Sequence, residues 1–325
     1  MQSIIKIGTR ESQLAVWQAA TVQKHLEANG YKAELHLIKS EGDIDLKTPL
    51  YEMGVQGIFT HSLDVALLNN KIDIAVHSMK DVPTQLPQGL SQAAVLKRGN
   101  YKDLFVFNSK LKSSKELDTL RFAISGNEPS AENMAMLQAI NIGTSSTRRK
   151  AQWLHRFPGH GIENIRGNVN TRMAKLQASS WHGVIFAAAG LERVGLRPDD
   201  AVELEWMLPA PSQGAIMVAA NEGDEKILAA CRCLNDDDTA ACTKIEKDFL
   251  RTLMGGCTTP ISALAIIKDN QLHFKGSILS LDGTSKVQVE KTVTLAQSND
   301  LGTTMATELL NNGGKAIADA IRQKI

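Results

Sequence analysis

Residues 72–77 read Ile72-Asp73-Ile74-Ala75-Val76-His77, with an isoleucine or valine at every second position. This alternation predicts a β-strand. Working outward, we expect earlier strands at 4–7 and 33–39. Helices are expected at 12–30, where the first residue is a serine N-cap and the last a closing glycine, and at 62–70. Strands and helices that alternate in this way predict a mostly parallel sheet, which binds ligands at the carboxyl ends of its strands.

The remainder of the chain predicts a second α/β unit and a smaller unit of another kind. Strands at 104–107 and 183–187 flank helical stretches, and 209–214 is a connector that returns to the first unit. A helix at 241–253, three alternating strands and a C-terminal helix then predict an α+β unit with an antiparallel sheet. The expected fold is two α/β domains and a small C-terminal α+β domain, divided as 1–100 with 209–232, 101–208 and 233–325.

Composition restricts the class of protein. The 325 residues are 43% hydrophobic and 22% charged, with 36 Lys and Arg against 35 Asp and Glu. A net charge of +1 argues against a nucleic-acid-binding protein. No run of eighteen apolar residues and no signal peptide is seen, so a cytoplasmic protein without a membrane span is expected. Four cysteines do not form a disulfide framework, and the spacing of Cys231, Cys233 and Cys242 does not support a metal site.

A lysine and an aspartate follow the strand at 72–77, in His77-Ser78-Met79-Lys80-Asp81-Val82-Pro83. The end of a strand is where α/β proteins place functional groups, so Lys80 and Asp81 are candidate site residues. The alternative is a surface ion pair of little energetic value. For His77 the favoured interpretation is a structural histidine with its hydrogen bonds satisfied.

Arginines gather in the second unit, within Gly143-Thr144-Ser145-Ser146-Thr147-Arg148-Arg149, within 166–172 and at Arg193. Small hydroxyl residues that open a helix offer donors to an anion, and arginines add bidentate partners. Any single arginine is better explained as part of a solvated helix face. The whole set favours a site for several carboxylates or phosphates, and nucleotides are not expected because no glycine-rich phosphate motif is present.

The segment Met254-Gly255-Gly256-Cys257-Thr258-Thr259-Pro260 places a thiol after two glycines. Glycines free the backbone from side-chain sterics, so Cys257 can be displayed on a tight exposed loop for covalent chemistry. The segment alone fits a buried core cysteine equally well.

Together these segments resemble the porphobilinogen deaminase (hydroxymethylbilane synthase) family. The matching stretches occur in the family's order and span nearly the whole chain: 8–12 with Trp17 and Gln18, 77–83, 143–149, 166–169 with Thr171 and Arg172, and 255–257 with Pro260. The resemblance implies that the first two domains are similar to type II periplasmic binding proteins, with a cleft and a hinge between them. It also implies a monomer that carries a dipyrromethane cofactor, joined through a thioether to Cys257. On this primer four porphobilinogens are added head to tail with loss of ammonia, and hydrolysis then releases the linear tetrapyrrole hydroxymethylbilane.

The resemblance assigns roles to individual residues. Asp81, Lys80 and Arg10 are the implied catalytic residues, and Asp81 would accept hydrogen bonds from pyrrole N–H groups and stabilise positive charge. Besides Cys257, the implied cofactor contacts are Ser12, Lys80, Asp81, Thr144, Ser145, Ser146, Arg148, Arg149, Arg166, Gly167 and Arg172. The implied contacts to porphobilinogen, which carries an acetate and a propionate, are Arg10, Gln18, Arg148, Arg149, Arg166, Arg172, Arg193 and Gln213.

The chain departs from the family pattern in two places. Glu52, Gln56 and His61 stand in a loop where the family often has lysines, and 125–141 is longer than usual. Three alternatives to an active deaminase remain at this point. They are a ligand-binding module with the same fold, a family member that has lost activity, and a nucleic-acid-binding protein.

Overall fold

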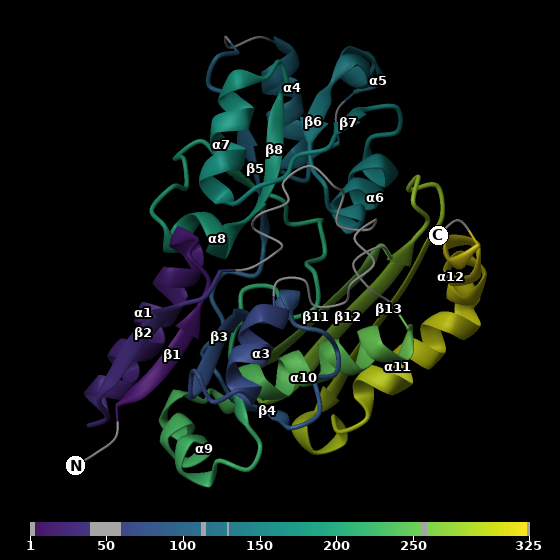
Figure 1. Cartoon of the computed structure of the whole chain (residues 1–325). Coiled ribbons are helices and arrows are strands. Elements are labelled where there is room, and N and C mark those ends of the chain that lie inside the picture. Colours follow the sequence, from purple (N-terminus) through teal and green to yellow (C-terminus); the bar gives the residue numbers. More distant parts are fainter. Residues whose placement is uncertain (1–3, 40–59, 112–114, 129, 255–258, 324–325) are drawn as a thin grey trace.

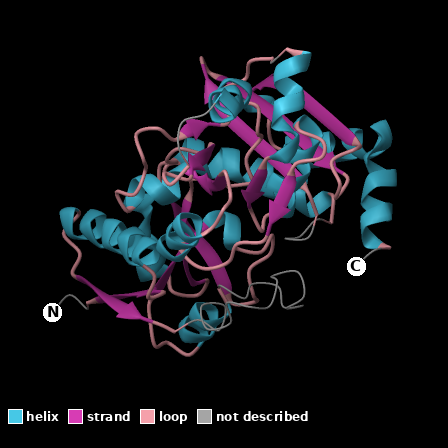
Figure 2. Ribbon diagram, turned by 90° about the horizontal axis from the view of Figure 1, so that it is seen from above, coloured by secondary structure: helices cyan, strands magenta, loops and turns pink. Residues whose placement is uncertain are grey.

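The computed structural model describes residues 4–39, 60–111, 115–128, 130–254 and 259–323. In this part of the chain three β-sheets, each with its own helices, form three units (Figure 1). Figures 1 and 2 both place the N-terminal end beside the first unit and the C-terminal end on the opposite side of the molecule, beside the third. Among the described residues, none of the helices has the length and apolar composition that a membrane span requires.

The first unit is built on a five-stranded sheet with the order β2-β1-β3-β10-β4. Its strands are β1 (Ile5–Thr9), β2 (Ala33–Leu37), β3 (Ile74–Ser78), β4 (Leu90–Val95) and β10 (Ile216–Asn221), and its helices are α1 (Gln13–Ala28), α3 (His61–Leu68) and α9 (Glu225–Cys231). Both faces of β3 are covered, because Ile74 and Val76 pack in the core beneath α1 while Ala75 packs in the core beneath α3. Ser12 caps α1 as predicted, with its hydroxyl accepting a hydrogen bond from the Ala15 amide.

The second unit repeats this plan with the order β7-β6-β8-β5-β9. Its strands are β5 (Asp103–Phe107), β6 (Asn141–Gly143), β7 (Gly161–Glu163), β8 (Gly183–Ala187) and β9 (Val202–Glu203), and its helices are α4 (Lys115–Ile124), α5 (Ala131–Met136), α6 (Thr147–Arg156), α7 (Val169–Ala178) and α8 (Ala188–Arg193). Trp153 of α6 stacks on Phe105 of β5 at 5.2 Å between ring centroids. The long stretch 125–141 contributes Leu137 and Ile140 to this core.

The two sheets have the type II periplasmic-binding-protein strand order that the resemblance implies. The chain passes from one sheet to the other twice. It leaves β4 of the first sheet for β5 of the second, and it leaves β9 of the second sheet for β10 of the first. Both β5 and β10 run antiparallel to their neighbours, whereas the three strands on one side of them are parallel. The sheets are therefore mixed, and the expected parallel arrangement holds for the other strands.

The third unit is a three-stranded antiparallel sheet covered by helices, as the sequence predicted. Its elements are α10 (Asp237–Thr252), β11 (Ile261–Lys268), β12 (Gln271–Leu279), β13 (Lys286–Thr294), α11 (Leu301–Leu309) and α12 (Lys315–Arg322). Helix α10 begins four residues before the predicted start, because Asp236 caps it and two more aspartates in its first turn stabilise the positive end of the helix dipole. The single predicted C-terminal helix is two helices, interrupted where Gly313 has φ of 104°.

A buried ion pair joins the third unit to the two crossovers between the sheets. Arg98, which follows β4, contacts Glu246 of α10 at 2.6 Å between Nη1 and Oε1. The same carboxylate accepts hydrogen bonds from the amide of Ser212, in the return crossover, and from the amide of Ala265 in β11. Glu246 therefore ties the third unit to both segments that join the first and second units.

Candidate active site

A cavity of about 240 Å³ lies between the first and second units. The first unit contributes residues from the start of α1 and the end of β3, and the second unit contributes residues from α6, the 166–169 segment, α7 and β8. Sequence-predicted residues that line this cavity, here called the cleft, are Arg10, Ser12, Gln18, Lys80, Asp81, Arg149, Arg166, Gly167 and Arg172.

The wall from the first unit presents Lys80 and Asp81 on a single 3₁₀ turn directly after β3. Next to them, Gln18 of α1 donates a hydrogen bond from its side-chain amide to the Ser78 hydroxyl, at 2.9 Å. Burial lowers the pKa of Lys80 to about 8, although the Asp81 carboxylate acts in the opposite direction. The ammonium and the carboxylate are therefore adjacent at the end of a strand, as predicted.

His77 also lines the cleft and is buried. Burial, and secondly the charge of Arg10, lower the pKa of His77 to about 4, so the ring is neutral at neutral pH. Its Nε2 atom has no hydrogen-bond partner among the described residues. The structure thus agrees with a buried histidine but not with one whose hydrogen bonds are all satisfied.

In the second unit a single carboxylate, Asp103, holds two of the predicted arginines. Its Oδ2 lies 2.8 Å from Nη1 of Arg148, and its Oδ1 lies 2.8 Å from Nη2 of Arg149. Gln213 donates a third contact to Oδ1, at 3.0 Å. Asp103 is fully buried, and burial opposes the two guanidinium charges, which nevertheless hold the pKa of Asp103 at about 2.

The sequence argument did not identify Asp103. The sequence does carry a sign of a buried carboxylate, because Asp103 starts the otherwise apolar stretch Asp-Leu-Phe-Val-Phe. In the structure this stretch is β5, and every one of its residues is buried. A buried carboxylate needs a cationic partner, and the nearby sequence offers Lys102 as readily as a distant arginine. Lys102 in fact pairs with Glu203.

The segment 166–172 forms a compact cationic turn. Arg172 donates from Nε to the Gly167 carbonyl at 2.8 Å, and burial lowers the pKa of Arg172 to about 10, so the guanidinium stays charged at neutral pH. Gly167 has φ of 116°, and a Cβ at this position would lie 2.6 Å from the Thr171 side chain, so this turn requires glycine.

The hydroxyl residues before α6 satisfy local hydrogen bonds instead of lining the cleft. Ser146 caps α6 by accepting from the Arg149 amide, and Ser145 bonds to both the carbonyl and the amide of Ile165. Thr144 is buried and accepts from the Ser146 amide. In this structure their role is to position the arginine-bearing helix.

Other sequence-predicted residues lie elsewhere. Arg148 and Gln213 are buried behind the cleft wall in the Asp103 network, and Arg193 lines a different cavity. Cys257, Glu52 and Gln56 lie outside the described residues. His61 opens α3 at an exposed position, and no described residue of 125–141 is among those that line the cleft.

The charges of the cleft favour polyanionic ligands. Among the described side chains that line the cleft, five are cationic, namely Arg10, Lys80, Arg149, Arg166 and Arg172. Among the same residues, Asp81 is the one acidic side chain. Arginine and lysine in a partly enclosed site bind carboxylates through charge-assisted hydrogen bonds.

Two family models match the chain, one over most of its length and one over its C-terminal part. Residues 5–229 match the model described as "Porphobilinogen deaminase, dipyromethane cofactor binding domain", and residues 240–311 match "Porphobilinogen deaminase, C-terminal domain". The chain belongs to the porphobilinogen deaminase family. It is therefore a transferase with hydroxymethylbilane synthase activity and a dipyrromethane cofactor, and it acts in porphyrin and heme biosynthesis.

Individual relatives agree with the family assignment. The porphobilinogen deaminase of Desulforamulus reducens is 37% identical over 326 residues, which cover 99% of each chain. That of Syntrophotalea carbinolica is 37% identical over 324 residues, or 98% of this chain and 96% of the relative. Among solved structures, an arginine-specific periplasmic binding protein of Salmonella typhimurium is similar over 73% of this chain and 93% of its own, with 12% identity and a TM-score of 0.36.

Proposed function

We propose that the cleft is the site where this family member condenses porphobilinogen, with Asp81 as its catalytic carboxylate. The observation that carries this proposal is the placement of one carboxylate among five cationic side chains. A carboxylate so placed accepts hydrogen bonds from pyrrole N–H groups and stabilises the positive charge that develops on a pyrrole nitrogen during bond formation.

The cationic residues would bind the acetate and propionate groups of the substrate. Arg10, Arg166 and Arg172 are placed to form bidentate contacts, while Arg149 is held rigidly by Asp103 and by the carbonyl of Ile185. We assign Arg148 a positioning role, because it contacts Asp103 and the Leu208 carbonyl and does not line the cleft.

The residues of the cleft fit the dipyrromethane cofactor, since its pyrrole rings carry carboxylates that match the cationic walls. When bound, the cofactor supplies the pyrrole carbon to which the first substrate is joined. We propose Cys257 as the attachment residue. In the sequence, Cys257 falls between the end of α10 and the start of β11. Ser12, Lys80 and Arg149, which line the cleft, would hold the carboxylates of the cofactor.

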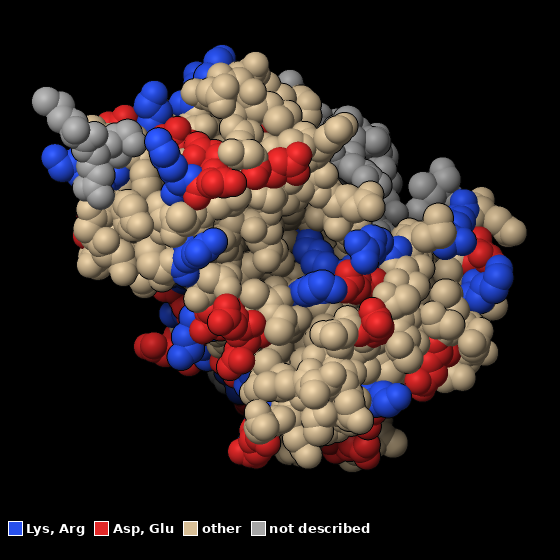
Figure 3. Space-filling model, turned by 90° about the horizontal axis from the view of Figure 1, so that it is seen from below, with Lys and Arg blue, Asp and Glu red and all other residues tan. Residues whose placement is uncertain are grey.

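We further propose that the three units are three domains and that the protein acts as a cytoplasmic monomer without nucleic acid. On the face shown in Figure 3, a few lysines and arginines gather beside the central hollow, and the others lie scattered among acidic residues. This distribution, with a net charge of +1, supports the last point.

The test of Asp81 is the substitution Asp81→Asn, with Asp118→Asn on the exposed face of α4 as the control. We expect turnover of porphobilinogen to fall at least a hundredfold in Asp81→Asn, because an amide cannot stabilise the cation, and to be unchanged in the control. Intact mass under denaturing conditions would show whether each variant retains two linked pyrrole units. A loaded Asp81→Asn variant with normal turnover would refute the role of Asp81.

The same mass measurement tests the attachment residue. Cys257→Ser should yield protein at the bare polypeptide mass, and a normally loaded variant would exclude Cys257.

A further inference from the structure

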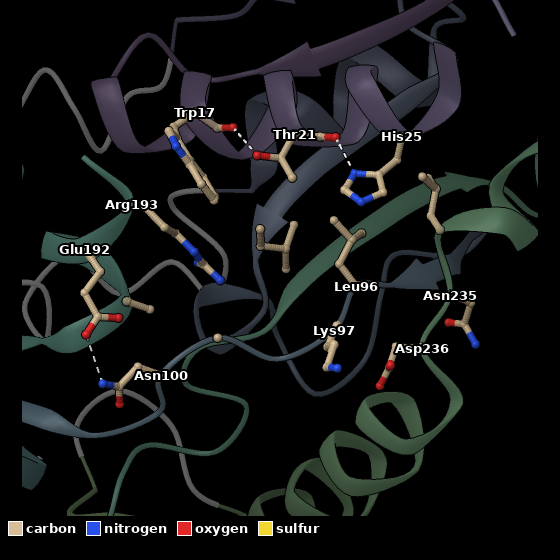
Figure 4. A pocket seen from close by; sticks show the side chains of 14 residues that line it. Trp17, Thr21, His25, Leu96, Lys97, Asn100, Glu192, Arg193, Asn235 and Asp236 are labelled. Carbon is tan, nitrogen blue, oxygen red and sulfur yellow. Dashed lines mark hydrogen bonds between the residues drawn. The ribbon is translucent and has the colours of Figure 1, made fainter. Parts of the chain in front are cut away.

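A second cavity, distinct from the cleft, lies between α1, α8 and the segment that joins the first two sheets. It measures about 420 Å³, and its labelled lining residues include Trp17, Thr21 and His25 of α1 and Glu192 and Arg193 of α8 (Figure 4). Gln18 of α1 lines the cleft, whereas Trp17, Thr21 and His25 on another face of the same helix line this second cavity, here called the hinge cavity. None of the steps assigned above uses it.

The walls of the hinge cavity come from both α/β units and from the crossover between them. Helix α1 belongs to the first unit and α8 to the second, and residues 96–100 form the crossover that joins the two sheets. A molecule bound there would contact all three at once. Its binding energy would depend on the angle between the units.

The cations of this cavity have hydrogen-bond donors to spare. Arg193 donates from Nη2 to the Gly214 carbonyl at 2.6 Å, and its guanidinium carbon lies 5.5 Å from the Trp17 ring centroid. Figure 4 shows Arg193 pointing toward Trp17, and no other hydrogen bond of its guanidinium is found among the described residues. Burial lowers the pKa of Arg193 to about 10, so it remains charged at neutral pH. Lys97 is exposed, and its ammonium has no hydrogen bond or ion pair among the described residues.

The acidic residues of the cavity are already engaged. Glu192 accepts from Asn100 at 3.0 Å and from Arg197 at 2.5 Å. Asp236 caps α10 by accepting from the Thr239 amide at 2.8 Å. Arg193 and Lys97 therefore supply donors for an anionic group, although the charges of Glu192 and Asp236 balance theirs across the whole lining.

Part of the remaining surface is apolar and suits a flat ring, whereas Thr21, His25, Asn100 and Asn235 add polar groups. Leu96, Ile216 and Leu234 are buried side chains that line the cavity, and Trp17 is 39% exposed beside them. The volume of this cavity lies within the range of small-molecule sites, and its lining combines apolar side chains with polar and charged ones.

We propose that the hinge cavity is a second ligand site, which binds a small planar aromatic carboxylate. The carboxylate lies between Arg193 and Lys97, and the ring packs on Trp17 and Leu96. Because the ligand bridges both units, its binding holds them at one angle and slows turnover without competing with porphobilinogen. The effect on turnover rests on the proposed function, whereas the binding itself does not.

The experiment is isothermal titration of the cofactor-loaded protein with indole-2-carboxylate and, as a neutral probe of the same shape, indole-2-carboxamide. We expect the carboxylate to bind at least tenfold more tightly than the amide. Lys97→Met should weaken its binding about tenfold, and Thr21→Leu, which fills part of the cavity, should weaken it more. Saturating carboxylate should lower kcat for porphobilinogen and leave KM unchanged.

Two binding results would overturn the proposal, and so would one kinetic result. One is the absence of carboxylate binding, and the other is binding that neither variant changes, since the probe would then occupy the cleft. Competitive inhibition, seen as a raised KM, would also place it in the cleft. Turnover of the wild-type protein without probe, measured alongside, tests the proposed function separately.

Discussion

Asp103 should contribute more to stability than any other carboxylate of the second unit, and Asp103→Asn measures this. The substitution leaves Arg148 and Arg149 buried without a counter-charge, because both guanidinium groups pair with this one side chain. Removal of one partner from a buried ion pair typically costs about 3–5 kcal/mol.

The pKa of Asp103 gives a second value, of the same order, for the free energy by which its ionised form stabilises the fold. A fall from the ordinary value of 3.8 to about 2 corresponds to about 2 kcal/mol of stabilisation at neutral pH. Because the pKa is depressed in the folded protein, this stabilisation is complete above about pH 4 and is lost as the pH falls toward 2. The difference between wild type and Asp103→Asn should therefore shrink over that interval.

The assay is urea unfolding followed by tryptophan fluorescence. Trp153, Trp181 and Trp206 all belong to the second unit, so the signal reports mainly on the unit that contains Asp103. With a slope of about 2 kcal/mol per molar urea, a loss of 3–5 kcal/mol lowers the midpoint by about 2 M. The exposed Asp199 of the same unit provides the control, Asp199→Asn, which should not shift it. A shift below about 0.5 M, on the same slope, would refute the claim that Asp103 neutralises the arginines.

Three further predictions concern other parts of the molecule. Glu246→Gln breaks the ion pair at the base of the hinge and should lower stability by about 3 kcal/mol, measured by urea unfolding, while the cofactor load stays normal. Gly276→Ala would place a Cβ 2.5 Å from the Phe249 ring and should cost about 1–3 kcal/mol, whereas Gly223→Ala, where no atom lies within 4 Å, should be near neutral in the same assay. The pKa of Lys80 is about 8, so its positive charge is lost as the pH rises through that value, and KM for porphobilinogen should rise above pH 8. Lys80→Arg should remove this rise in KM. If the dependence of KM on pH is the same in both proteins, Lys80 does not bind the substrate carboxylates.

Local pattern was sufficient to predict most of the framework. The Ser12 cap, the helix at 147–156 and the strand at 183–187 depend on residues close together in the sequence, and the structure has all three. The direction of β5 and β10 depends instead on the crossovers between the sheets. The sequence of β5 or β10 does not show this direction, so a mostly parallel sheet was expected without identifying which strand in each sheet is antiparallel.

Site residues could be predicted where a sequence motif stands at the end of a strand. They could not be predicted where contacts with residues distant in sequence set the direction of the side chain. Lys80 and Asp81 follow a strand, and strand ends meet at one edge of the sheet. The side chains of Arg148 and Arg193 point away from the cleft because Asp103 and the Gly214 carbonyl, both distant in sequence, hold them. Cys257 stays a prediction, since it lies outside the described residues.

The charge of the cleft limits how long a product it can hold. Each pyrrole unit derived from porphobilinogen brings two carboxylates, so a primer of two units carries four. The described cleft offers five cations and one carboxylate, and one of the cations, Arg149, is already paired with Asp103, so the four carboxylates of the primer exceed the three positive charges that remain. Every later unit adds two negative charges that this cleft cannot neutralise one for one. Its carboxylates must therefore reach water or cations beyond the described lining.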